Sequence, residues 1–72
     1  MDKQQIAAFE HWMSNNSGRR INAIIAMRAY KEAYDVLINW HEFSSLLASL
    51  HLSGKLELMG HNSNGMTEYI VL

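Results

Sequence analysis

The chain has 72 residues, no cysteine, and six Lys and Arg residues against seven Asp and Glu residues, for a formal net charge of −1 at pH 7. So short a chain supports one hydrophobic core, and we expect a single domain over residues 1–72. This composition excludes disulfides and thiolate chemistry, favours a reducing cytoplasmic setting, and provides no general attraction to phosphates or anionic membranes.

The N-terminal segment predicts a helix rather than a targeting signal. Met1–Gln5 lacks the basic start and apolar run of a signal peptide, and no stretch reaches the roughly 20 apolar residues of a membrane span, so we expect no membrane partner. From Asp2 to about Met13, apolar residues recur at every third or fourth position, which is typical of an amphipathic helix. Asp2 suits the N-cap, and the turn-favouring run Asn15–Gly18 ends the helix.

The middle of the chain predicts two further helices. Arg19–Leu52 contains neither glycine nor proline and is rich in helix-favouring residues. Asn39 and Glu42 have the spacing of a capping box, in which the Asn39 side chain accepts from the Glu42 backbone N–H and the Glu42 side chain reaches back. We therefore expect one helix over Asn22–Ile38 and another over Trp40–Leu52, with the tryptophans and tyrosines mostly in the core.

The C-terminal segment predicts a β-hairpin. After Gly54 the apolar period changes to two, which places Leu56 and Leu58 on one face of a strand. The cluster Gly60–Gly65 is a turn, and Met66–Leu72 is a second alternating strand. The expected fold class is α+β, with three helices followed by a C-terminal β-hairpin.

Three helices and then a hairpin, in one short chain, resemble a winged helix-turn-helix domain. The resemblance covers nearly the whole chain and rests on the order of the elements. It implies a short strand at Arg19–Ile21 before an Asn22 cap, a hairpin that forms the wing, and a third helix that presents side chains to DNA bases. A second helix over Asn22–Ile38 is longer than is usual in that family.

One interpretation of this resemblance is a DNA-binding transcriptional regulator. The residues expected to contact DNA are Arg19, Arg20 and Lys55 at phosphates and His41, Ser44 and Ser45 near bases. The third helix, however, contains no Arg or Lys, which are the commonest readers of guanine. Arg28 and Lys31 have acidic helical neighbours in Glu32 and Asp35, and are partly neutralised by them.

Nothing in the sequence predicts catalysis, a cofactor or a metal. The chain has four histidines, His11, His41, His51 and His61. No two of them have the spacing of four residues that places two imidazoles on one helical face. No serine is placed beside a base by its spacing, and a fold of this size rarely encloses a substrate cavity. We expect a protein that is not an enzyme.

The last strand indicates an interaction surface, because both of its faces are apolar. With Thr67, Tyr69 and Val71 pointing inward, the other face exposes an apolar patch of the kind that marks a binding site. The predicted anchors are Met59, Met66, Ile70 and Leu72, with Glu57 and Glu68 as a polar rim and Tyr30 or Tyr34 as helix contributions. The leading hypothesis is a small regulatory or inhibitory protein that binds another protein, as a homodimer.

Overall fold

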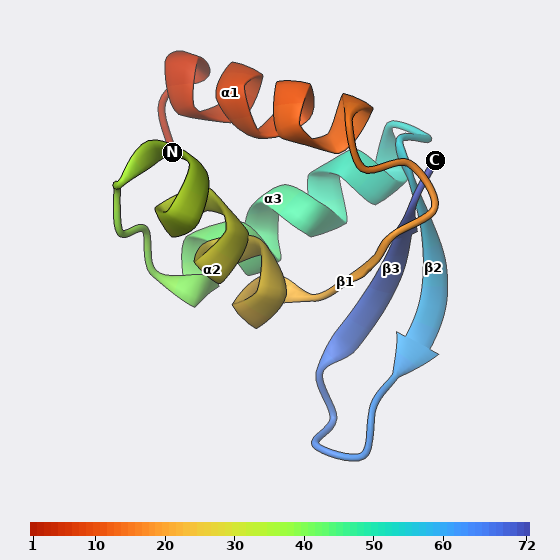
Figure 1. Cartoon of the computed structure of the whole chain (residues 1–72). Coiled ribbons are helices and arrows are strands. Elements are labelled where there is room, and N and C mark those ends of the chain that lie inside the picture. Colours follow the sequence, from red (N-terminus) through yellow and green to blue (C-terminus); the bar gives the residue numbers. More distant parts are fainter.

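The computed structural model describes residues 1–72 and contains three helices and a three-stranded antiparallel sheet (Figure 1). In chain order the elements are α1 (Lys3–Ser14), β1 (Arg20–Ile21), α2 (Ala23–Tyr34), α3 (Trp40–Leu52), β2 (Leu56–His61) and β3 (Thr67–Val71). The expected helices and C-terminal hairpin are therefore confirmed. The strands are not a hairpin alone, however, because β1 joins them in a sheet of order β1-β3-β2. No helix has the length and apolar character needed to cross a membrane.

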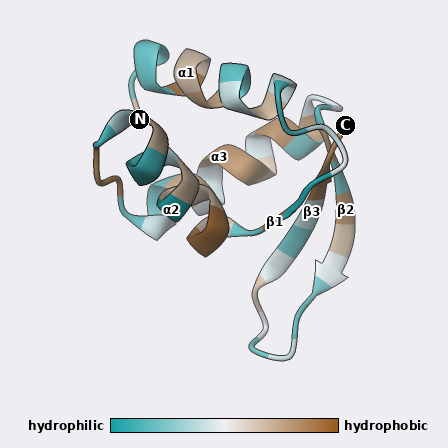
Figure 2. Ribbon diagram, viewed as in Figure 1, coloured by the Kyte–Doolittle hydropathy of each residue, from teal (hydrophilic) through white to brown (hydrophobic).

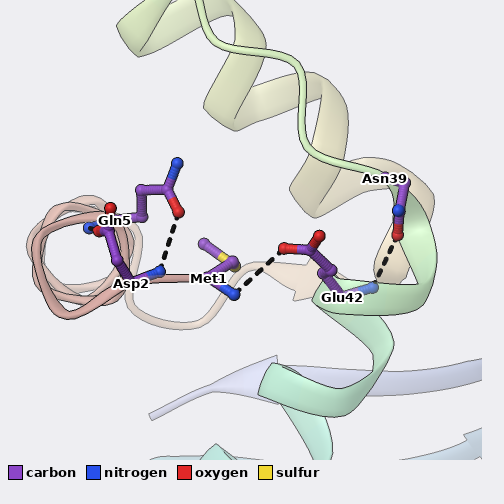
Figure 3. A network of polar contacts seen from close by, with 5 residues as sticks. All are labelled: Met1, Asp2, Gln5, Asn39 and Glu42. Carbon is purple, nitrogen blue, oxygen red and sulfur yellow. Dashed lines mark hydrogen bonds and ion pairs between the residues drawn. The ribbon is translucent and has the colours of Figure 1, made fainter.

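The start of α1 is fixed by the cap that the sequence predicts. The Asp2 carboxylate accepts a hydrogen bond from the Gln5 backbone N–H at 2.8 Å, and the Gln5 side-chain oxygen accepts from the Asp2 N–H at 3.0 Å. The two bonds satisfy donors that a helix N-terminus otherwise leaves unpaired. Figure 3 shows this capping box beside the start of α3.

Helix α2 begins where expected but ends early. Asn22 caps it by accepting from the Ile25 N–H at 2.9 Å. The helix stops at Tyr34 because Asp35 adopts a left-handed conformation with φ 55°. The expectation of a helix up to Ile38 is therefore wrong. The early stop frees Ile38 to turn into the core, where it is buried, and aspartate is one of the few residues that tolerate this conformation.

Helix α3 is capped by Asn39, whose side chain accepts from the Glu42 N–H at 3.0 Å. The predicted return bond from the Glu42 side chain does not form. The Glu42 carboxylate instead accepts from the Met1 ammonium at 3.1 Å (Figure 3). That ion pair ties the beginning of α1 to the first turn of α3.

The sheet is organised around β3, which pairs with both other strands. In the hairpin, Leu56 is opposite Val71 and Leu58 is opposite Tyr69, and a bulge follows between Leu58 and Gly60. The helices lie on one side of the sheet, and the hairpin tip extends beyond them (Figure 1). Figure 2 shows a hydrophilic tip, whereas the apolar parts of β2 and β3 lie nearer α3.

The core lies between the three helices and the inner face of the sheet. Its largest wholly buried side chains are Phe9, Ile21, Phe43, Leu47, Leu56 and Val71. The Phe9 and Phe43 rings meet edge to face with centroids 5.2 Å apart, and Tyr30 lies 5.7 Å from Phe43. Aromatic contacts therefore join one residue from each helix at the centre of the molecule.

Candidate protein-binding surfaces

A hollow of about 240 Å³ lies between the start of α2, the first half of α3 and the hairpin loop. We call it the α3–hairpin groove. The side chains that matter to its chemistry are Trp40, Ser44, Asn64, Met66, Thr67 and Tyr69. None of the residues that line it carries a charge. An uncharged hollow with aromatic walls and a few hydrogen-bonding groups resembles the centre of a protein interface more than a phosphate site.

Trp40 is the most accessible apolar side chain at this groove. It is the first residue of α3, 42% of it is exposed, and its ring stacks on that of His41 with centroids 3.9 Å apart. The expectation that the tryptophans are core residues fails here. The sequence groups Trp40 with the other aromatic residues expected in the core, but the exposed Ser44, one turn later, shows that this side of α3 faces outward.

The residues predicted to read DNA bases lie together on the exposed side of α3. His41, Ser44 and Ser45 are all exposed, and Ser44 lines the groove. They supply hydroxyl and imidazole groups but no cation with which to hold a phosphate at this face. Base recognition normally accompanies a larger number of phosphate contacts.

The residues predicted to hold phosphates lie elsewhere. The Lys55 ammonium pairs with the Glu10 carboxylate of α1 at 2.6 Å. The Arg19 guanidinium lies over the Trp12 ring, 5.2 Å from its centroid. Arg20 is in β1, and like the other two it does not line the groove. The structure therefore separates these cations from the proposed base-contacting residues.

The predicted outer patch of the hairpin is smaller than the sequence indicated. Ile70 is half-buried, and its neighbours across the sheet are Arg20 on one side and Glu57 on the other. Met59 and Leu72 are exposed, at 46% and 61%. Charged residues therefore interrupt the apolar surface on this side.

Glu68 and Met66, which were also predicted to belong to this patch, are less exposed than Met59 and Leu72. Glu68 is half-buried. Met66 lines the α3–hairpin groove, so the prediction that it belongs to the outer face is wrong. It precedes β3 and lies in the turn, where its backbone N–H donates to the Asn62 side chain at 3.1 Å, and strand alternation does not extend to it.

Neither tyrosine predicted to extend this surface is available at the hairpin. Tyr30 is 4% exposed and belongs to the core, so its predicted binding role is wrong. Burial raises the pKa of Tyr30, and the nearby Tyr34 and Asp2 add to the increase. Tyr34 is 37% exposed, but its hydroxyl donates to the Ala8 carbonyl at 2.9 Å and joins α2 to α1.

Leu58 is an exposed apolar residue of the hairpin that the sequence did not predict to be exposed. Alternation placed it on the inner face with Leu56, and the register agrees, since its partner Tyr69 is buried. It is nevertheless 49% exposed, because β2 is one of the two edge strands of the sheet and has no neighbouring strand on its outer side. The alternation of apolar residues along a strand predicts which face is inward, but it does not indicate how far the helices cover that face.

The histidines have separate environments. His51 bonds through Nδ1 to the Leu56 carbonyl at 3.1 Å, and His61 lies 3.1 Å from the Thr67 hydroxyl in the hairpin. Nowhere does the structure gather three side chains that could ligate a metal ion.

Comparison of the chain with protein-family models, curated proteins and solved structures gave no match.

Proposed function

We propose that this chain is a non-enzymatic regulatory protein that acts by binding another protein at the α3–hairpin groove. The observation that carries the proposal is the chemistry of the groove, which combines Trp40 and Met66 with hydrogen-bonding side chains and contains no charge. Aromatic residues and methionine are enriched at the centres of protein interfaces, and charged residues are depleted there. Trp40 is also of the residue type that most often dominates binding energy.

The groove favours a partner with an apolar side chain that enters the hollow. A volume of about 240 Å³ is below that of a typical small-molecule site and suits one large side chain. Ser44 and Asn64 lie at its walls and offer hydrogen bonds to a partner backbone. The expected partner surface is therefore neutral and presents a protruding apolar residue.

A winged-helix DNA-binding regulator is the second candidate, and the element order supports it. The succession α1-β1-α2-α3-β2-β3, with β3 between β1 and β2, agrees with the strand and wing that the resemblance implies. The early end of α2 at Tyr34 also removes the excess length that the sequence suggested. Against this candidate stands the absence of any cation at the groove, because phosphate contacts supply most of the affinity for DNA.

Replacing Trp40 tests the first candidate. The wild-type chain, Trp40→Ala and Leu37→Ala are each immobilised and used to capture proteins from cells that express the chain. Leu37 is a matched control, because it is 72% exposed but lies in the connection between α2 and α3. We expect a protein retained by the wild type and by Leu37→Ala to be lost with Trp40→Ala. Equal retention by all three baits would contradict the proposal.

Fluorescence anisotropy with a labelled random-sequence duplex separates the two candidates. Without phosphate contacts at the groove, we expect no binding when the salt concentration is lowered from about 200 to about 50 mM. Binding that strengthens steeply over that range, and that Arg19→Ala with Arg20→Ala abolishes, would favour the DNA-binding regulator instead.

A further inference from the structure

The outer edge of β2 carries backbone groups that the sheet does not use. Val71 directs its backbone at β1, where its N–H donates to the Arg19 carbonyl at 3.0 Å and its carbonyl accepts from the Gly18 N–H at 2.6 Å. Leu56, which is opposite Val71, must therefore direct its N–H and C=O away from β3. By the alternation of an antiparallel strand, Leu58 directs its own pair of groups to the same free edge.

The His51 side chain occupies one of the outward backbone groups of this edge. Its Nδ1 donates to the Leu56 carbonyl at 3.1 Å, which agrees with the outward direction of that carbonyl. The residue two positions later, Leu58, has no such cover. Its side chain is 49% exposed, and the adjacent Met59 is 46% exposed.

The usual protections of an edge strand are scarce in β2. Natural sheets discourage edge pairing with lysine, proline or a bulge. β2 has no Lys, Arg or Pro between Leu56 and His61, and Glu57 is its one charged residue. The bulge comes after Leu58, so it leaves Leu56–Leu58 regular. The edge of this short, nearly neutral strand therefore has one unpaired backbone N–H and one unpaired C=O, both at Leu58.

We propose that two copies of the chain pair antiparallel along β2, with Leu58 opposite Leu58 about a twofold axis. A twofold contact is self-complementary, and the one free N–H and one free C=O of Leu58 satisfy each other across it. The three strands of each copy then form one continuous sheet of order β1-β3-β2-β2-β3-β1. The helices of both copies lie on the same side of that sheet.

The charge of Glu57 and the hydrogen bond from His51 to the Leu56 carbonyl favour this register over one shifted by a residue pair. A shift that placed Leu56 opposite Leu58 would bring the two Glu57 carboxylates directly opposite each other, which is destabilising. It would also require the Leu56 carbonyl that His51 occupies. With Leu58 at the axis, Glu57 is opposite Met59, the bulge residue that has no partner in β3, and the exposed residues Leu58 and Met59 become less accessible to solvent.

This contact does not depend on the proposed function, because it uses the edge of β2 and leaves Trp40 and the α3–hairpin groove open. It also differs from the outer-face dimer that the sequence suggested. A pairing limited to one short strand is smaller than the roughly 1,200 Å² buried by a standard interface. We therefore expect a weak dimer that forms as the protein concentration is raised.

A single introduced cysteine tests the register, because the chain has no cysteine of its own. Opposed residues of a hydrogen-bonded antiparallel pair have Cα atoms about 5.5 Å apart, within the range for a disulfide. Under mild oxidation we expect Leu58→Cys to form a disulfide-linked dimer at least ten times faster than Leu37→Cys, which is also exposed. Equal rates for the two variants would overturn the proposal.

Sedimentation equilibrium tests the backbone contact. Leu58→Pro removes the outward N–H without removing a bond to β3, and proline is tolerated at such edge positions. We expect the wild type to shift from monomer to dimer with rising concentration, and Leu58→Pro to stay monomeric with an unchanged helical circular dichroism signal. A wild type that is monomeric at every concentration, or a folded Leu58→Pro that dimerises as the wild type does, would overturn the proposal. If Leu58→Pro does not fold, the cysteine pair decides the question.

Discussion

Tyr30 packs its ring against Phe43 and Tyr34 in the core, and this position changes its ionisation. Burial disfavours the phenolate and raises the pKa above the ordinary value of 10.0, with additional contributions from Tyr34 and Asp2. The unfolded chain therefore loses this proton at a lower pH than the folded chain does. The resulting stability is complete below pH 10.0 and decreases as the pH rises from there toward the folded pKa.

Replacing Tyr30 by Phe should remove this part of the alkaline loss of stability. Urea unfolding at pH 7 and at about pH 11, on either side of the ordinary tyrosine pKa, measures the difference. We expect the free energy of unfolding of Tyr30→Phe to decrease less between the two values than that of the wild type. Tyr34→Phe is the control: it loses the hydrogen bond to Ala8, so it should be less stable by about 1 kcal/mol already at pH 7. An unchanged alkaline loss in Tyr30→Phe would show that other groups cause it.

At the scale of elements, the caps decide where helices begin. Asn39 is exposed and its side chain accepts from the Glu42 N–H, so its replacement tests the cap with little change in packing. Asn39→Ala should lower the free energy of unfolding by about 1 kcal/mol, whereas Asn39→Asp keeps the acceptor and should stay near the wild type. Thermal unfolding followed by circular dichroism measures both. If Asn39→Asp were as unstable as Asn39→Ala, the side-chain bond would not be the cause.

Helix starts and the hairpin could be predicted because their signals are local. Asp2, Asn22 and Asn39 each have a short polar side chain directly before an apolar periodic segment, and each is a cap in the structure. The end of α2 could not be predicted in this way. No glycine or proline marks it, and Asp35 takes its left-handed conformation so that Ile38 reaches the core, which is a tertiary effect.

The candidate site was predicted less well than the fold, for a related reason. Ser44 and Met66 were singled out for different functions on different surfaces, yet they line the same groove. Residues of the hairpin loop and of the first half of α3 line this groove together, and the periodicity of either segment alone does not indicate which residues of the other lie beside it. Likewise, periodicity placed the tyrosines mostly in the core but did not distinguish the buried Tyr30 from the more exposed Tyr34.

At the scale of the whole molecule, stability depends on one small core. Phe43 is wholly buried and contacts the rings of Phe9 and Tyr30, so Phe43→Ala leaves a cavity where the three helices meet. Such a substitution costs about 3–5 kcal/mol, which is comparable with the whole stability expected for a domain of this size. We expect Phe43→Ala to be largely unfolded at 25 °C by circular dichroism. Leu52→Ala, at a position that is 85% exposed, should fold as the wild type does.

The central place of β3 in the sheet also bears on the order of events during synthesis. All three helices precede β3 in the chain, so they are synthesised before the strand that pairs with both β1 and β2. Closing the sheet requires Val71 to meet Gly18 and Arg19 across almost the full length of the chain, and such distant contacts form slowly. A chain truncated before Thr67 retains β1 and β2 but lacks the strand that pairs with both of them, so it cannot form the sheet.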